Sequence, residues 1–157
     1  MPKAILDTTI LSNFAHIQRP DLLQSVFQTD AVTTAVVMAE LKAGVVLGWV
    51  PRCDWSWLQV TRLTNVEQSL ADDYRRKLDP GESGCLAIAQ RRALVLVSDD
   101  FAAQRLAQQA GVAVSGTIGV LQELVAAQLL TLAQADAYLA VMVGRGYRAP
   151  MRSLQEL

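Results

Sequence analysis

The sequence predicts an α/β protein, built as a three-layer α/β/α sandwich around a central, mainly parallel sheet. Short aliphatic segments with strand character alternate with helix patterns along the chain, and this order is typical of parallel sheets covered by helices. Hydrophobic residues make up 52% of the 157 residues and aromatic residues only 6%, a mixture that suits helices packed on a sheet. The length is that of one domain, and we expect residues 1–157 to form a single one.

The first part of the chain predicts two strands and three helices. AILD (4–7) is typical of a short buried strand that ends in a carboxylate. TTILSNFAHI (8–17) has apolar residues at helical spacing, and Asp7 or Thr8 is suited to cap that helix. The remaining expected elements are a short helix at RPDLLQSVF (19–27), a strand at AVTT (31–34) and a longer helix at TAVVMAELKAGVVLG (34–48).

The rest of the chain continues the alternation. WSWLQV (55–60) alternates and indicates a strand or an extended edge segment. ALVLVSDD (93–100) is the clearest strand, because a continuous aliphatic run is expected of a strand buried on both faces. DPGESG (79–84) interrupts the helical pattern. The other expected elements are helices at 65–78, 85–92, 101–111, 117–130 and 131–146, and a strand at 112–116.

Composition excludes several classes of function. The 14 Lys and Arg residues nearly balance the 15 Asp and Glu residues, so the basic footprint of many nucleic-acid binders is missing. The single histidine, His16, rules out metal-free cleavage by paired imidazoles, and it has no nucleophile elbow beside it. Two cysteines cannot form a disulfide framework, and no signal peptide or membrane helix is expected, so a cytoplasmic location is predicted.

Carboxylates follow the two most convincing strands, at Asp7 and at the Asp99–Asp100 pair. If these strands are neighbours in a parallel sheet, their acids meet at one edge, where functional side chains collect. Glu40 lies one helical turn after the apolar positions 36 and 37 and is expected to lean into the same cleft. Glu82 opens a helix after Pro80 and Gly81 and is expected at the rim.

Carboxylates gathered in one place repel each other unless a cation balances them. Mg²⁺ or Mn²⁺ prefers oxygen ligands, and such an ion can activate water for phosphodiester hydrolysis without any histidine. Each acid also has a plainer explanation, because Asp7, Glu82 and the Asp99–Asp100 pair all stand where a helix cap or a helix dipole favours a carboxylate. Glu40 alone is equally well explained as a solvated helix residue paired with a lysine. Only the order in which all these acids occur along the chain indicates a shared functional site.

That order resembles the PIN-domain family. DTTILSNFAHI..PDLL (7–23) is similar to the start of PIN proteins, and it looks closest to a VapC-like branch of uncharacterised members. The resemblance continues nearly to the end of the chain, through AVVMAEL (35–41), GESGCLAIA (81–89), VSDD (97–100) and SGTIGVL (115–121). It implies an Mg²⁺- or Mn²⁺-dependent ribonuclease acting on single-stranded RNA. It also implies a homodimer and, as in many members, a toxin held inactive by a small antitoxin.

The resemblance also assigns roles to residues. Its acids fall on Asp7, Glu40, Glu82, Asp99 and Asp100, of which all but Glu40 are expected to hold the metal. Neighbouring hydroxyls are expected to support them, at Thr8, Thr9, Ser98 and Thr117. Two positions depart from the pattern: Gly84 stands where the branch often has a second acid, and Cys85 where PIN toxins usually have Asp.

Those two departures leave a second hypothesis open, a PIN-like fold that serves as a binding or regulatory module with little catalysis. A third class, a phosphoryl-transfer receiver or phosphatase, is disfavoured because the chain has no D-x-D-x-T motif and no lysine after a later strand end. Trp55 and Trp57 suit packing better than base stacking, and Cys85 is expected to be buried and inert. The arginines near the end of the chain suit either RNA phosphates or a solvated surface, namely Arg145, Arg148 and Arg152.

Overall fold

The computed structural model describes residues 3–156, and its centre is a sheet whose five strands all run parallel. The order across the sheet is β3-β2-β1-β4-β5. The strands are β1 (Ala4–Leu6), β2 (Ala31–Thr34), β3 (Gln59–Thr61), β4 (Val95–Val97) and β5 (Val114–Ser115). β1 pairs with β4 in the register Leu6 to Val97, which confirms that the AILD and ALVLV segments are neighbouring inner strands.

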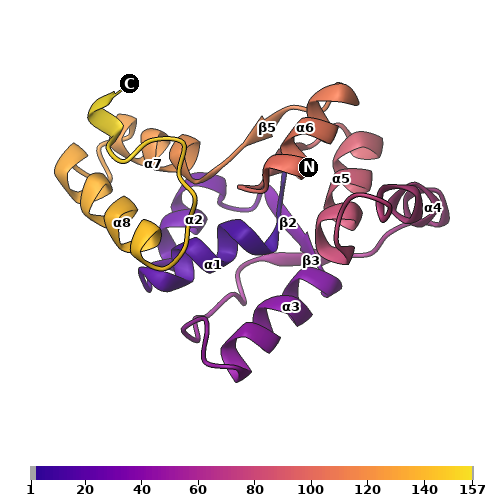
Figure 1. Ribbon diagram of the computed structural model, residues 1–157, viewed down its shortest axis with the longest axis horizontal. Coiled ribbons are helices and arrows are strands. Elements are labelled where there is room, and N and C mark those ends of the chain that lie inside the picture. Colours follow the sequence, from indigo (N-terminus) through magenta and orange to yellow (C-terminus); the bar gives the residue numbers. More distant parts are fainter. Residues whose placement is uncertain (1–2, 157) are drawn as a thin grey trace.

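Eight α-helices and a final 3₁₀ turn accompany this sheet within residues 3–156. Their bounds are α1 (Thr8–His16), α2 (Pro20–Phe27), α3 (Ala35–Val46), α4 (Asn65–Tyr74), α5 (Pro80–Arg92), α6 (Phe101–Gln109), α7 (Thr117–Ala126), α8 (Leu132–Gly144) and η1 (Leu154–Glu156). Helices α1, α2, α7 and α8 lie to one side of the strands and α4, α5 and α6 to the other (Figure 1). The predicted three-layer α/β/α fold is confirmed, with a fully parallel sheet.

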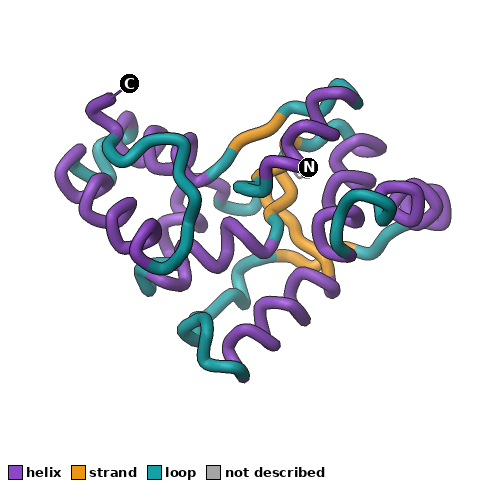
Figure 2. The backbone as a smooth tube through the Cα atoms, viewed as in Figure 1, coloured by secondary structure: helices purple, strands orange, loops and turns teal. Residues whose placement is uncertain are grey.

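The three inner strands, β2, β1 and β4, are almost entirely buried. Every residue of β1 and β2 is buried, as are Leu96 and Val97 of β4. One continuous core joins these strands to the apolar sides of the helices, with Ile5, Phe14 and Leu121 among its fully buried members. The strands are short and the loops after them lead directly into helices (Figure 2). Side chains at the strand ends are therefore held by a rigid centre.

Two local predictions were wrong. Residues 79–84 do not interrupt the helical pattern, because α5 already begins at Pro80, and Asp79 and Glu82 cap it reciprocally. The strand expected at 55–60 covers only Gln59–Thr61, because the chain turns at Trp55, whose carbonyl accepts a hydrogen bond from the Leu58 amide at 2.9 Å. Trp55 and Trp57 pack against each other with ring centroids 6.4 Å apart, in agreement with the packing role expected for them.

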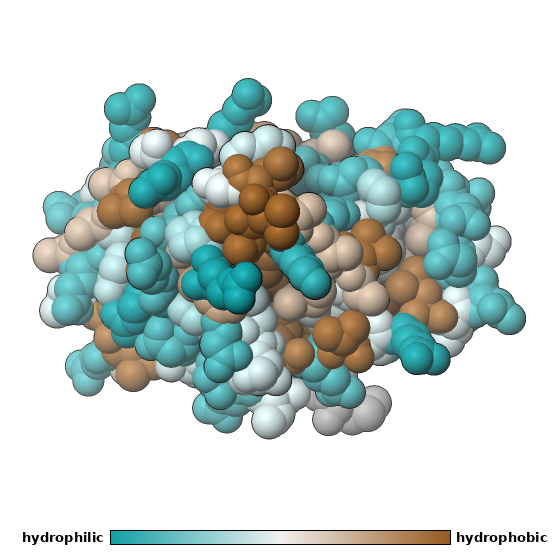
Figure 3. Space-filling model, turned by 90° about the horizontal axis from the view of Figure 1, so that it is seen from below, coloured by the Kyte–Doolittle hydropathy of each residue, from teal (hydrophilic) through white to brown (hydrophobic). Residues whose placement is uncertain are grey.

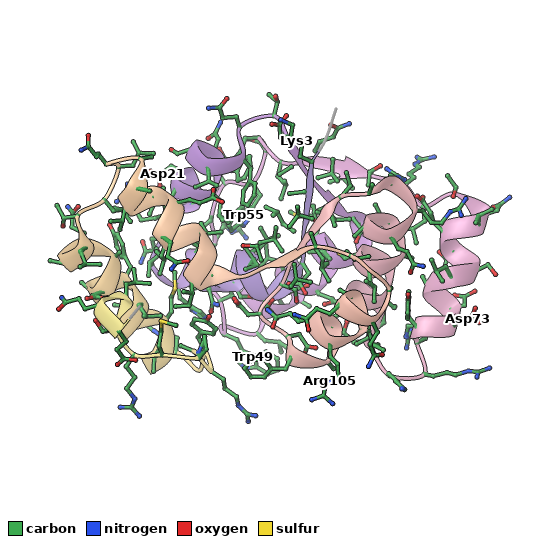
Figure 4. All side chains as sticks on the ribbon, turned by 90° about the horizontal axis from the view of Figure 1, so that it is seen from above. Lys3, Asp21, Trp49, Trp55, Asp73 and Arg105 are labelled. Atoms are coloured by element: carbon green, nitrogen blue, oxygen red, sulfur yellow. The ribbon has the colours of Figure 1, made fainter. Side chains whose placement is uncertain are left out.

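The surface carries separate apolar residues and one local concentration of them at the end of α3. Val46, Leu47 and Trp49 are 76%, 59% and 71% exposed. The face on the α3 side shows a compact hydrophobic group among hydrophilic residues (Figure 3). Trp49 lies at the periphery, whereas Trp55 lies within the molecule (Figure 4). None of the helices in residues 3–156 has the length and apolar character that crossing a membrane would require.

Candidate functional site

The adjacent inner strands β1 and β4 bring Asp7 and Asp99 to the same edge of the sheet. β1 and β4 end side by side, and the Asp7 amide donates to the Val97 carbonyl at 3.2 Å. Thr9 joins the two acids, because its hydroxyl donates to Asp7 Oδ1 at 2.5 Å and accepts from the Asp99 amide at 2.9 Å. The convergence expected of two parallel strand ends is thus observed.

Asp7 is 1% exposed and begins α1 as its N-cap. Its Oδ1 accepts the Thr9 amide at 2.9 Å, and its Oδ2 accepts the hydroxyl of Ser98. Burial nevertheless raises the pKa of Asp7 to about 6, and the nearby charge of Asp99 adds to that effect. The capping role and a functional role are therefore compatible, because the cap fixes a carboxylate that its surroundings leave short of positive charge.

Asp99 is held by a ring of donors. Its Oδ1 accepts the Thr117 amide at 2.8 Å, and its Oδ2 accepts the Thr117 hydroxyl at 2.5 Å and the Asn13 amide group at 2.8 Å. Tyr147 also approaches this carboxylate with its hydroxyl. Burial raises the pKa of Asp99, although these donors oppose the rise. Asn13 and Tyr147 were not among the residues predicted for the site.

Asp100 lies beside Asp99 but has a different local task. Its Oδ1 accepts the Ala103 amide at 2.8 Å and caps α6, and its own amide donates to the Ser98 hydroxyl at 3.2 Å. Ser98 thus contacts both Asp7 and Asp100. The second carboxylate oxygen of Asp100 takes part in no hydrogen bond within the described residues.

Glu40 reaches the site from α3. Its Oε2 accepts the hydroxyl of Thr8 at 2.9 Å, whereas its Oε1 is buried without a hydrogen-bond partner among the described residues. Burial raises the pKa of Glu40, and the charge of Asp79 raises it further. Gly81 makes room for this side chain, because a Cβ atom there would lie 2.5 Å from Glu40 Oε1.

Glu82 lies in the first turn of α5. Its amide donates to Asp79 Oδ1 at 2.8 Å, and its carboxylate accepts a longer hydrogen bond from the Asp79 amide at 3.4 Å. Burial raises the pKa of Glu82 to about 8, with further increases from Asp79, Asp100 and Asp7. The charges of Asp100 and Asp7 therefore act on Glu82, although the only hydrogen bond of its carboxylate among residues 3–156 is with Asp79.

A cleft of about 570 Å³ opens at this edge. Its acidic wall consists of Glu40, Asp79, Asp99 and Asp100, while Asp7 lies buried and Glu82 lies outside the lining. Asp79 was missed as a site residue, and its signal was available in the sequence as the cap that precedes Glu82. The polar face of α1 lines the cleft floor with Thr8, Thr9, Ser12, Asn13 and His16.

The segment after α8 also lines the cleft and carries positive charge. Arg145, Tyr147 and Arg148 line it, and both arginines are exposed. His16 also lines the cleft, its Nδ1 is buried and unpartnered among the described residues, and burial followed by the charge of Arg145 lowers its pKa. The lining of the cleft therefore includes both carboxylates and guanidinium groups, a combination suited to a phosphodiester and a cation together.

The donor set fits a hard divalent cation. In residues 3–156 no three acidic, histidine or cysteine side chains are arranged so that they already enclose a metal ion. Mg²⁺ does not require such a cage, because it keeps several waters and uses one or two carboxylates plus substrate phosphate. The buried unpartnered Glu40 Oε1 and the raised pKa values of Asp7, Glu82 and Asp99 indicate negative charge that lacks a counterion.

Comparison with known families agrees with this geometry. The family model of a PIN domain matches residues 3–157. The chain belongs to the PIN-domain family. PIN domains are generally nucleases and typically use divalent metals, so a nuclease-type fold with a nucleic-acid substrate is established at the level of the family. No curated protein matches the chain.

The two positions at which this PIN domain departs from the expected pattern have different surroundings, and only Cys85 lies close to the acids. Cys85 is fully buried, with its Sγ 3.9 Å from the Leu6 carbonyl, and burial together with the charges of Asp7 and Glu40 raises its pKa well above the usual range. Cys85 is therefore a buried thiol, as predicted, directly behind the acidic wall. Gly84 faces Leu63, since a Cβ atom there would lie 3.7 Å from that side chain.

Proposed function

We propose that this PIN domain is a metal-dependent endoribonuclease that hydrolyses single-stranded RNA. The observation that supports the proposal most directly is the pair of Asp7 and Asp99, linked through Thr9 at the ends of adjacent strands. Both carboxylates are fixed by hydrogen bonds, and Asp99 borders a cleft whose lining also includes Arg145 and Arg148. Such a site favours an anionic backbone and a divalent cation bound together.

In this proposal Asp7, Glu82, Asp99 and Asp100 hold Mg²⁺ or Mn²⁺, and Glu40 completes the acidic wall. The cation would supply a water of lowered pKa and charge stabilisation for the leaving oxygen. Thr9, Ser98 and Thr117 orient the carboxylates, because each donates to Asp7 or Asp99. Thr8 does the same for Glu40. Glu82, with its pKa near 8, keeps a proton at neutral pH until a positive charge displaces it.

The test is cleavage of a labelled single-stranded RNA by the purified protein. We expect cleavage with Mn²⁺ or Mg²⁺, loss of cleavage with a chelator, and recovery on adding Mn²⁺ again. Asp7→Asn should remove the activity, whereas Asp73→Asn should retain it. Asp73 is exposed on α4, at the edge of the molecule (Figure 4). Equal cleavage by wild type and Asp7→Asn would show that the activity is a contaminant or that the site lies elsewhere.

A second candidate function is a binding or regulatory module with weak or no catalysis. The observations that favour it are the absence of carboxylates at Gly84 and Cys85 and of a ready-made metal cage in the described part of the chain. Under this alternative the protein binds single-stranded RNA in the presence of a chelator and shows no cleavage with any divalent ion. Its melting temperature is not raised by Mn²⁺.

The cellular role that we propose is that of a VapC-like toxin, active as a homodimer in the cytoplasm and silenced by a small antitoxin. This rests on the family resemblance of the motifs at 7–23 and 81–89. A short reading frame overlapping the gene, whose product co-purifies with the protein and suppresses RNA cleavage, is the expected finding. A gene without such a neighbour, whose expression leaves cell growth unchanged, would contradict the toxin role and leave the nuclease proposal in place.

A further inference from the structure

A second hollow adjoins the catalytic cleft on the far side of Asp99. It measures about 180 Å³ and lies between α6 and the segment that follows α8. Four residues line both this hollow and the cleft, so the two spaces share a border: Asp99, Phe101, Tyr147 and Arg148. A ligand whose phosphate lies in the cleft can therefore place an adjoining group in the second hollow.

The walls of the second hollow suit a flat aromatic group. Phe101 is 57% exposed although it is the first residue of a helix that covers the sheet, and nothing in the described fold uses its ring. Ile118 and Pro150 provide further apolar surface. Aromatic side chains exposed beside a phosphate-binding cleft are the usual stacking partners of unpaired bases.

The floor of the hollow carries a polar group that is already positioned. Gln104 Nε2 donates to the Ser98 carbonyl at 2.6 Å, which fixes the amide. A Cβ atom at Gly116 would lie 2.7 Å from Asp99 Oδ1 and 3.5 Å from Gln104 Nε2. Glycine at this position therefore leaves room for the Asp99 and Gln104 side chains. The Gln104 carboxamide oxygen and its second N–H remain for a ligand, and a carboxamide can recognise the edge of a base.

We propose that this hollow is a nucleobase pocket: the base next to the scissile phosphate stacks on Phe101 and is read by Gln104, while Arg148 pairs with the strand. The inference rests on the proposed function, because it places the base of the same RNA strand whose phosphate occupies the cleft. It requires an unpaired base, since a base within a duplex cannot leave its stack without a cost. The pocket therefore gives a physical reason for a preference for single strands.

Binding is tested separately from cleavage, with a fluorescein-labelled single-stranded RNA 12-mer in a chelating buffer. Phe101→Ala should weaken binding by about tenfold or more, the range expected when one stacked base loses its aromatic partner. Phe101→Trp should restore it, and Phe101→Leu should not, because leucine is apolar but has no ring face. Leu129→Ala is the matched control, since Leu129 is 53% exposed and lines neither the cleft nor the hollow.

Two further arms make the assignment specific. Arg148→Ala should weaken binding more than Arg105→Ala, because Arg105 lines neither space and lies at the outer edge of the molecule (Figure 4). Gln104→Ala should change the ranking among 12-mers that differ in base composition while changing their average affinity by less than Phe101→Ala does. Circular dichroism of each variant checks that the fold is retained.

The outcomes separate this inference from the nuclease proposal. Tighter binding to the single strand than to a duplex of the same sequence, with loss in Phe101→Ala, supports the base pocket even if no metal supports cleavage. Equal binding by wild type, Phe101→Ala and Phe101→Leu overturns the base pocket even if Mn²⁺-dependent cleavage is intact. An absence of single-strand binding by wild type overturns it as well.

Discussion

The two halves of the acidic site differ in how firmly they are held. In the strand-borne half, all four carboxylate oxygens of Asp7 and Asp99 accept hydrogen bonds, and both acids follow buried strands directly. In the helix-borne half, Glu40 has one buried oxygen without a partner among residues 3–156, and within the same residues the Glu82 carboxylate is bonded only in its own helix cap, at 3.4 Å. The first half is preorganised, whereas the second has longer side chains that a cation must order.

The two halves therefore differ in the free energy needed to prepare them for catalysis. A carboxylate fixed by hydroxyls and amides needs no reorganisation when charge develops in the transition state. A carboxylate with a missing partner and a raised pKa costs free energy in the metal-free protein and regains it only when a cation binds. We therefore expect substitutions in the strand-borne half to lower the rate most, and substitutions in the helix-borne half to alter the metal requirement.

The largest difference in RNA cleavage is expected between Asp7→Asn and Glu82→Gln. Asp7→Asn keeps the shape of the side chain but removes a fixed charge, and it should lower RNA cleavage by about a hundredfold or more at saturating Mn²⁺. Glu82→Gln should lower it by about tenfold and raise the Mn²⁺ concentration needed for half-maximal rate. Initial rates across a Mn²⁺ titration measure both quantities. Equal losses in the two variants would show that the halves do not differ.

The next effect concerns the room that Gly81 leaves for Glu40. Gly81→Ala would place a Cβ atom 2.5 Å from Glu40 Oε1 and 2.9 Å from its Cδ, so the carboxylate must move and its bond to Thr8 should break. We expect about a tenfold loss of cleavage with the fold retained, as for loss of one positioned contact. The matched control is Gly84→Ala in the same helix, where the added atom meets only Leu63 at 3.7 Å. Unchanged activity in both variants would remove Glu40 from the site.

A smaller effect is expected from the hydroxyl that supports Asp99. Thr117→Val removes a 2.5 Å hydrogen bond to the carboxylate but leaves the backbone bond from the same residue. Because that bond stabilises the charged form, its loss should raise the pKa of Asp99 and move the acidic limb of the pH–rate profile to higher pH. Thr117→Ser should restore the wild-type profile. A uniform loss of rate at every pH would instead indicate a packing defect.

Sequence reasoning located the strand-borne half well and the helix-borne half less well. Continuous aliphatic runs ending in Asp7 and Asp99 predicted two adjacent parallel strands. The aliphatic character of each run and the acid at its end are both visible in the local sequence. The helix pattern failed at 79–84, because Pro80 and two glycines resemble a break although Asp79 and Glu82 cap a helix there. Asp79 as part of the cleft, and Asn13 and Tyr147 on Asp99, depend on packing between segments far apart in the chain, which no local pattern encodes.

The smallest expected effect is a pH dependence of stability in the metal-free protein, to which both halves contribute. The folded-state pKa values of Asp7 and Glu82 are raised, to about 6 and about 8, from ordinary values of 3.8 and 4.5. The fold therefore favours their protonated forms, and the stability associated with them is fully present below pH 4 and is lost as the pH rises through 6 and then 8. We expect the melting temperature in a chelating buffer to fall by a few degrees between pH 5 and pH 9, since about 1 kcal/mol corresponds to about 2–4 °C at this chain length.

The variants divide this loss between the two halves of the site. Asp7→Asn should remove the loss that is complete near pH 6 and Glu82→Gln the loss that is complete near pH 8, because each substitution removes one titrating carboxyl group. Asp73→Asn, on the exposed side of α4, should leave the wild-type curve unchanged. Added Mn²⁺ should raise the melting temperature most at the alkaline end, where the acids are ionised and can bind it. A melting temperature that rises from pH 5 to pH 9 without metal would contradict the crowded-carboxylate account of both halves. A fall that persists unchanged in both variants would place the responsible group elsewhere in the molecule.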